Sequence, residues 1–298
     1  MTTANAQAAT QPNEARSLNR RLLPWILIAP AGLFLAVLLA ATLMIVRLSF
    51  GLKGMEWAVW SIENYQQLQQ SLYLQSIVLT FKLAFLSTVI VVVLSIPIAM
   101  VMARTRSAAL RRLILFVLLL PLLVNLLLQS YGWIVLLAPD GLVNRAIRGL
   151  GLANHPILFL FNETGVLIGL VQTTFPLAAL PIAASLRSVP YSLEEAANVL
   201  GATRLRVFVE VQLPLMFPGI IAASILVFAY NASSFVIPFL LGGRRVSMLA
   251  VLIRDQMGPL LNWPFGSANA VVLVVLTLIA LAAYQHVSGG HGALHARR

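Results

Sequence analysis

Long apolar stretches alternate with short polar segments along almost the whole chain. A helix rises about 1.5 Å per residue, so about 20 consecutive apolar residues are needed to cross the roughly 30 Å hydrocarbon core of a bilayer. Six stretches meet this requirement, and the fourth is the least apolar because it contains Gln172, Thr173, Thr174 and two prolines. The pattern predicts an all-α membrane protein with six transmembrane helices, at residues 22–50, 74–102, 113–138, 165–186, 216–241 and 268–286.

The composition agrees with a membrane protein and excludes an ordinary soluble domain. Of the 298 residues, 60% are hydrophobic and only 10% are charged, whereas a soluble domain carries about 25% charged residues. The chain contains no cysteine, which excludes disulfides and thiolate metal sites. The remaining polar residues must therefore carry any function.

The basic residues indicate the orientation of the chain in the membrane. The net charge is +11, from 18 arginines, two lysines and nine acidic residues. If both termini are cytoplasmic, 12 basic residues fall in cytoplasmic segments and six in outer loops. Lysine and arginine are enriched on the cytoplasmic side of membrane proteins. The bias predicts an N-in, C-in topology and explains the basic charge without a nucleic-acid partner.

This topology divides the chain into an N-terminal tail, an anchor helix, a core of five helices and a C-terminal tail. We expect residues 1–21 to form a cytoplasmic tail and residues 22–50 a retained anchor helix. The apolar part of this first helix is longer than the 7–15 residues of a signal peptide, and no clear cleavage site follows it. Residues 74–286 form the predicted core, which includes a cytoplasmic loop at residues 188–215.

The remaining residues, 287–298, form a predicted C-terminal cytoplasmic tail. Three glycines in this tail predict that it forms no stable helix. His291 and His295 are four residues apart, which on a helix is the spacing of two metal ligands. Since no helix is expected, we expect no metal site here.

The loop at residues 188–215 has the pattern of two short helices joined at a glycine. Ser192 and Glu195 have the spacing of a capping box, which predicts a helix that begins at Ser192. Gly201 is placed to end this helix, and Thr203 to cap the next one. The first helix carries a stripe of apolar side chains at helical spacing, namely Leu193, Ala196, Ala197 and Leu200.

A helix of two turns is marginally stable alone, so its apolar stripe requires a partner. Glu194 and Glu195 make its N-terminal end negative and able to meet basic side chains of that partner. The pattern alone fits two alternatives equally well. The helix either docks on another protein or lies on the lipid surface.

Several residues of this loop resemble the EAA loop of binding-protein-dependent ABC importer permeases, namely Glu195-Ala196-Ala197, Gly201, Phe208 and Leu213-Pro214. The resemblance implies the type I importer (MetI-like) permease fold, with an anchor helix and five core helices. It also implies that the loop forms a coupling helix, which docks on a separate ATPase subunit. The residues expected to couple to the ATPase are Glu194, Glu195, Ala196, Ala197, Leu200, Gly201 and Phe208.

Four further segments resemble permeases of the spermidine/putrescine type, at residues 61–65, 234–243, 248–253 and 261–266. This resemblance favours a polyamine as the substrate. Permeases for opines, phosphonates and ferric iron belong to the same subgroup and remain alternatives. The absence of Asp and Glu from the six predicted spans weighs against a cationic substrate, although a partner permease could supply the acidic groups.

Polar side chains within the spans are the candidates for a substrate path, because polar groups are costly in lipid. The alternative is that they only form hydrogen bonds between helices, each worth about 1 kcal/mol. The candidates are Asn125, Gln129, Tyr131, Gln172, Thr173, Asn231 and Ser234.

The chain has no phosphate-binding loop of the type G-x-x-x-x-G-K-[ST], so ATP and Mg²⁺ are expected on a partner ATPase and no cofactor on this chain. The resemblance implies four kinds of partner: two ABC ATPase subunits, a second, different permease, an extracytoplasmic solute-binding protein and the lipid bilayer. No cluster of candidate catalytic residues is evident, so we expect a transport subunit and not an enzyme. The alternative class is a secondary transporter driven by an ion gradient, which would normally carry ionisable groups inside its spans.

Overall fold

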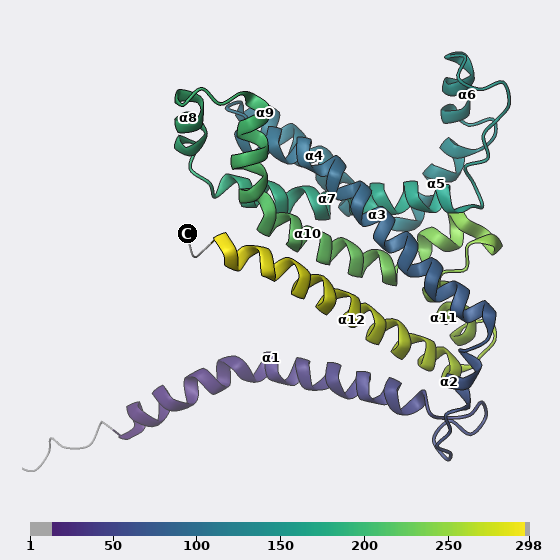
Figure 1. The fold of residues 1–298 in the computed structure, drawn as a ribbon. Helices are drawn as coiled ribbons and strands as arrows, with labels where there is room; N and C mark the ends of the chain where they lie inside the picture. The colour runs from purple at the N-terminus through teal and green to yellow at the C-terminus, as the bar shows by residue number, and fades with distance from the viewer. Residues whose placement is uncertain (1–13, 296–298) are drawn as a thin grey trace, which may run out of the picture.

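The computed structural model describes residues 14–295, and most of them are helical (Figure 1). The five longest helices run roughly along one another and are α1 (Glu14–Leu48), α3 (Ser71–Arg104), α7 (Glu163–Arg187), α10 (Leu213–Ser233) and α12 (Trp263–His295). The shorter helices are α2 (Glu63–Gln67), α4 (Ala108–Leu123), α5 (Leu126–Leu137), α6 (Leu142–Gly149), α8 (Ser192–Val199), α9 (Arg204–Val207) and α11 (Leu249–Met257). Three single turns complete the described elements: the π-helical η1 (Phe208–Gln212) and η2 (Pro238–Gly242), and the 3₁₀ turn η3 (Gly243–Arg245).

Within the described residues, six helical segments are long and apolar enough to cross a membrane, as predicted. The predicted fourth span is the continuous helix α7, even though Pro176 and Pro181 lie inside it. Membrane helices tolerate proline because neighbouring groups satisfy the freed backbone atoms. The six segments are Ile28–Leu48, Ser71–Arg104, Leu126–Gly149, Glu163–Arg187, Arg204–Ser233 and Trp263–His286.

The predicted third span, residues 113–138, is not one helix. It is divided between α4 and α5, and the backbone is extended at Val124 and Asn125, where ψ is 135° and 133°. The Asn125 side chain caps α5 by accepting a hydrogen bond from the backbone N–H of Leu127, at 2.8 Å. Hydropathy alone does not predict such a break, because the residues on both sides of it are apolar and a capping side chain changes the mean hydropathy little. The third of the six apolar segments, Leu126–Gly149, comprises α5 and α6 instead of α4 and α5.

Both predicted tails are partly helical. Helix α1 includes residues 14–21, and α12 continues to His295, so the prediction that the last tail forms no helix is wrong. A glycine costs about 1 kcal/mol in a helix, but extending an existing helix avoids the cost of nucleation. The rest of the predicted tails, residues 1–13 and 296–298, lies outside the described residues.

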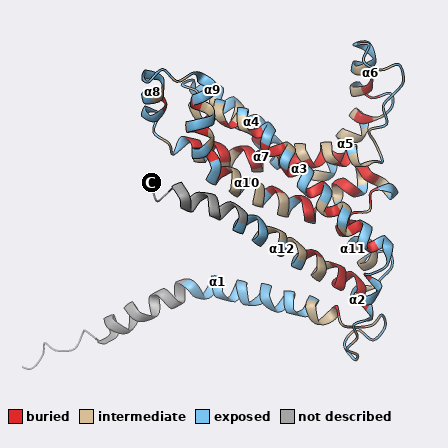
Figure 2. Cartoon of the chain, viewed as in Figure 1, coloured by how far each residue is buried: buried red, intermediate tan, exposed pale blue. Residues whose placement is uncertain are grey.

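The core is formed by α3, α7 and α10, where buried residues concentrate (Figure 2). Ala99, Ile182 and Ala223, one from each helix, are fully buried in the same apolar cluster. Helices α7 and α10 approach closely at Gly219, where a Cβ atom would lie 2.6 Å from the Ser185 Cβ and 2.7 Å from the Pro181 carbonyl oxygen. Small residues at such crossings let membrane helices pack tightly.

Helix α1 stands apart from this core (Figure 1). Its described side chains are exposed along most of its length and are largely apolar, including Leu33, Leu39 and Leu43. A helix that is apolar on all sides fits a lipid environment. Helix α1 contacts α12, and Arg47 in its last turn donates to the Trp57 carbonyl oxygen at 2.8 Å.

Candidate functional site

Helix α8 lies at one end of the helical core, beside α9 (Figure 1). It begins at Ser192, as predicted, but the predicted capping box is not formed. Tyr191 already has helical dihedral angles, and its carbonyl oxygen accepts from the backbone N–H groups of Glu194 and Glu195, at 3.0 and 3.2 Å. Ser192 therefore lies inside the first turn, where its hydroxyl cannot act as the cap.

Gly201 ends α8, as predicted. Its φ is +82°, a left-handed conformation that glycine adopts without steric cost. The Gly201 N–H donates to the Asn198 carbonyl oxygen and the Ala202 N–H donates to that of Ala197, both at 3.0 Å. This pair of hydrogen bonds is the Schellman arrangement that closes a helix.

The second helix of the loop also begins as predicted. The Thr203 hydroxyl accepts from the backbone N–H of Arg206, at 3.4 Å, and caps α9. Helix α9 continues through η1 into α10, so residues 204–233 form one long helical segment. The loop thus links α8 directly to a helix of the core.

Helix α8 and the adjoining residues expose an apolar surface, which we call the α8 patch: Leu193, Val199, Leu200 and Leu205, with exposed fractions of 47%, 87%, 87% and 72%. Glu195 and Ala196 are also exposed, and Ala197 is half-buried. These residues are accessible to a partner, as the coupling role requires. Phe208 instead packs against the apolar cluster of the core.

Glu194 does not face outward. Its side chain is 7% exposed and forms an ion pair with Arg104 of α3, with Oε1 and Nη2 2.5 Å apart. The expectation that Glu194 meets basic groups of a partner is therefore wrong, and Glu195 alone presents an exposed carboxylate on α8. The sequence offered no means of choosing between two adjacent glutamates.

Two of the candidate path residues meet at the break between α4 and α5. Asn125 caps α5, and the Gln129 Nε2 donates to the carbonyl oxygens of Pro121 and Val124, at 2.5 and 2.8 Å. These carbonyls belong to the last turn of α4, where no backbone N–H is available to them. The Gln129 Oε1 is buried without a hydrogen-bond partner.

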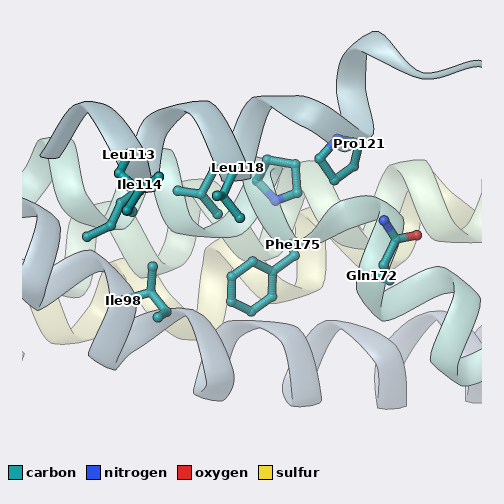
Figure 3. A pocket seen from close by; sticks show the side chains of 9 residues that line it. Ile98, Leu113, Ile114, Leu118, Pro121, Gln172 and Phe175 are labelled. Carbon is teal, nitrogen blue, oxygen red and sulfur yellow. The ribbon is translucent and has the colours of Figure 1, made fainter. Parts of the chain in front are cut away.

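A cavity of about 470 Å³ lies beside this break, between α3, α4 and α7. Figure 3 shows Leu118 and Pro121 of α4 facing Phe175 of α7 across it, with Gln172 near one end. The Gln172 Oε1 accepts from the Trp133 indole N–H at 3.1 Å, and the Thr173 hydroxyl is buried next to it. The cavity is apolar except at Gln172.

The other candidates lie elsewhere. Asn231 of α10 is fully buried, and its Nδ2 donates to the Ser87 hydroxyl of α3 at 2.8 Å. The Asn231 Oδ1 and the Ser234 hydroxyl are buried without a partner. Tyr131 is exposed on α5. The candidates other than Tyr131 thus lie in two regions, one near the break between α4 and α5 and one at the end of α10. Ser87 is a polar contact that sequence reasoning missed.

Among the described residues, no group of three or more histidine and acidic side chains lies close enough together to hold a metal ion. At the ends of the core helices away from α8, Lys82 of α3 pairs with Glu163 of α7, with Nζ and Oε2 2.7 Å apart. Both side chains are about half exposed. Such an exposed pair contributes little to stability.

Comparisons with known proteins agree on one family. A family model described as "Binding-protein-dependent transport system inner membrane component" matches residues 91–290. The spermidine/putrescine transport system permease protein PotB of Escherichia coli (strain K12) is 31% identical over 230 residues, which cover 77% of this chain and 83% of PotB. PotB of Haemophilus influenzae is 34% identical over 224 residues, which cover 75% of this chain and 78% of the relative.

A more distant relative and a solved structure extend the comparison. The molybdenum transport system permease protein ModB of Azotobacter vinelandii is 30% identical over 224 residues, covering 73% of this chain and 96% of ModB. A solved chain of a bacterial ABC transporter involved in the import of the acidic polysaccharide alginate is 17% identical. It superposes with a TM-score of 0.77 and covers 93% of this chain and 98% of its own length. The likeness confirms the predicted importer-permease fold.

Proposed function

Because the chain belongs to the family of binding-protein-dependent transport system inner membrane components, we propose that it forms part of the path through which an ATP-driven importer moves a polyamine such as spermidine or putrescine. It is a multi-pass protein of the bacterial inner membrane. The family assignment favours this role over a transporter driven by an ion gradient. The chain itself is proposed to catalyse no reaction.

The observation that carries the proposal is the α8 patch. Val199, the last residue of the short helix α8, and Leu200, which follows it, are both 87% exposed. Burying one such side chain contributes about 1.5–3 kcal/mol, so a protein partner would gain substantially from covering the patch. We propose that this partner is an ABC ATPase subunit, with ATP and Mg²⁺ bound there, and that Glu195 adds a polar contact at the edge of the patch.

The complete importer is proposed to contain a second, different permease, two ABC ATPase subunits and an extracytoplasmic solute-binding protein. The family description names a binding protein as a requirement of the transport system. One structural neighbour is a bacterial alginate ABC transporter in complex with an alginate pentasaccharide-bound periplasmic protein. The polyamine-type permeases that the chain resembles support two different permease chains.

The choice of a polyamine rests on the PotB relatives and on two buried oxygen atoms. The Gln129 Oε1 and the Asn231 Oδ1 are acceptors without a donor. An amide oxygen accepts hydrogen bonds and can therefore receive an ammonium group. We propose that these acceptors line successive parts of the substrate path and that acidic groups come from the partner permease.

The test is uptake into vesicles that contain this chain with its partner permease and ATPase, together with the matching binding protein. Radiolabelled spermidine and putrescine are added outside and ATP is enclosed. We expect uptake to require ATP, to be inhibited by vanadate and to continue at the same rate when the ion gradient is collapsed. Uptake driven by the ion gradient without ATP would contradict the proposal that the chain belongs to an ATP-driven importer. Uptake of molybdate but of neither polyamine would contradict the proposal that the substrate is a polyamine.

A further inference from the structure

The attachment of α8 to the rest of the chain is unusual in its chemistry. Of the eight residues of α8, the one that is buried is Glu194. A short helix normally buries an apolar face, whereas α8 leaves Leu193 and Val199 exposed and turns the Glu194 carboxylate inward. The contact that fixes α8 against α3 is therefore an ion pair.

Arg104 is the partner and holds three parts of the loop at once. It is the last residue of α3, and its side chain is 18% exposed. Its Nη2 lies 2.5 Å from the Glu194 Oε1, and its Nη1 donates to the Val189 carbonyl oxygen at 3.2 Å. Its guanidinium carbon lies 5.8 Å from the centre of the Tyr191 ring. One side chain thus connects the end of α3 to the connection between α7 and α8 and to α8 itself.

The ion pair is close but not ideally aligned. Nε and Nη2 of Arg104 and Oε1 of Glu194 are buried without an aligned hydrogen bond. Removing one member of a buried pair leaves the other charge uncompensated, whereas removing both does not. The pair is accordingly poor as a source of stability, and a role in positioning accounts better for two buried charges at this point.

Helix α3 extends the connection into the core. Ser87 lies 17 residues before Arg104, or about 25 Å along the helix axis, and its hydroxyl accepts from Asn231 of α10. Near the other end of α3, the Thr80 hydroxyl accepts from the backbone N–H of Leu249 of α11, at 2.8 Å. Arg104 therefore lies on the same helix as Ser87, which is hydrogen-bonded to the candidate path residue Asn231. A displacement of the Arg104 end of α3 would move this helix.

We propose that Arg104 and Glu194 are positioning residues that transmit the movement of α8 to α3 and so couple ATP hydrolysis to opening of the path. This inference rests on the proposed function, since it assumes that α8 docks on an ATPase. It differs from that function because neither residue belongs to the α8 patch. Loss of the pair should separate hydrolysis from transport without removing the ATPase.

The experiment uses the whole importer in vesicles and the variants Arg104→Ala, Glu194→Ala, Arg104→Lys and the double variant R104A/E194A. Three quantities are measured: the ATPase subunit that copurifies, the ATP hydrolysis rate and the polyamine taken up per ATP. The matched control is Glu163→Gln. It breaks the exposed ion pair between Glu163 of α7 and Lys82, which lies on α3 as Arg104 does.

We expect each single alanine variant to retain the ATPase subunit but to lose uptake per ATP at least tenfold. The double variant should lose no more than either single variant, because the two residues act as one unit. Arg104→Lys should recover part of the loss, and Glu163→Gln should match the wild type. If a single variant fails to fold, the double variant, which leaves no unpaired buried charge, provides the same test.

Uptake per ATP within twofold of the wild type in the folded alanine variants would overturn the inference. So would loss of the ATPase subunit from these variants alone, because the pair would then maintain the docking surface only. If the wild-type chain itself retains no ATPase subunit, the proposed function fails instead. The two failures are therefore distinguishable.

Discussion

At the scale of single residues, Gly201 determines how α8 is presented. Its φ of +82° lies in the left-handed region, and no atom lies within 4 Å of the position that a Cβ would occupy. A substitution would therefore act through the backbone conformation and not through a clash. Gly151 has a φ of +70°, the same open space and the same pair of closing hydrogen bonds at the end of α6. The chain thus contains a natural control.

Gly201→Ala should weaken the binding of the ATPase subunit, whereas Gly151→Ala should not. An alanine in the left-handed region costs about 1–2 kcal/mol, so the α8 loop should populate other conformations. The expected loss of ATPase affinity is about tenfold, the equivalent of 1.4 kcal/mol. Titration of the ATPase subunit onto the permease in lipid nanodiscs measures it. Equal affinities for the two variants would contradict this role for Gly201.

The sequence could not predict which of the two adjacent glutamates faces inward. Glu194 and Glu195 differ by about 100° around a helix, so only one can point towards α3. The choice depends on Arg104, which lies far away in the sequence. By contrast, the roles of Gly201 and Thr203 depend on local backbone geometry, and both were predictable from the sequence.

At the scale of helices, the crossing of α7 and α10 at Gly219 is a close contact that allows the packing of the core to be tested. A Cβ at Gly219 would lie 2.7 Å from the Pro181 carbonyl oxygen, a backbone atom that cannot move aside easily. Gly132 of α5 has no atom within 4 Å of the corresponding position. The two glycines therefore differ in packing while both lie inside helices.

Gly219→Ala should destabilise the protein, and Gly132→Ala should not. Overpacking of this kind costs about 1–3 kcal/mol, whereas alanine is favoured over glycine in an unobstructed helix by up to about 1 kcal/mol. Thermal unfolding of the purified chain in one detergent measures both effects. A midpoint for Gly219→Ala equal to or above that of the wild type would show that this crossing is not closely packed.

The number and approximate positions of the long helices followed from hydropathy, because each must be apolar over about 20 residues. The break between α4 and α5 did not follow, because residues 113–138 are apolar on both sides of it. Pro121 and Asn125 were the available signals, because proline has no backbone N–H to donate within a helix and asparagine is a good cap. The helical C-terminal end was not predicted, because the three glycines of the tail disfavour an isolated helix but not the extension of the long helix α12.

At the scale of the whole molecule, the regions that expose large apolar side chains include α1 and the α8 patch (Figure 2). Lipid accounts for the exposed side chains of α1, because they are apolar along a segment long enough to span the membrane. The α8 patch is shorter and lies beside Glu195 and the basic residues Arg204 and Arg206. A polar rim around an apolar centre is typical of a protein interface.

A photo-crosslink from the α8 patch in the assembled importer tests most directly whether α8 docks on an ATPase subunit. A photoreactive amino acid replaces Leu200, which is 87% exposed, and in a matched variant Leu152, which is 74% exposed and follows α6. After illumination of native membranes, we expect an adduct between position 200 and a P-loop ATPase, and none from position 152. An assembled, illuminated complex in which position 200 captures only lipid or this chain itself would contradict the claim that α8 couples the permease to an ATPase.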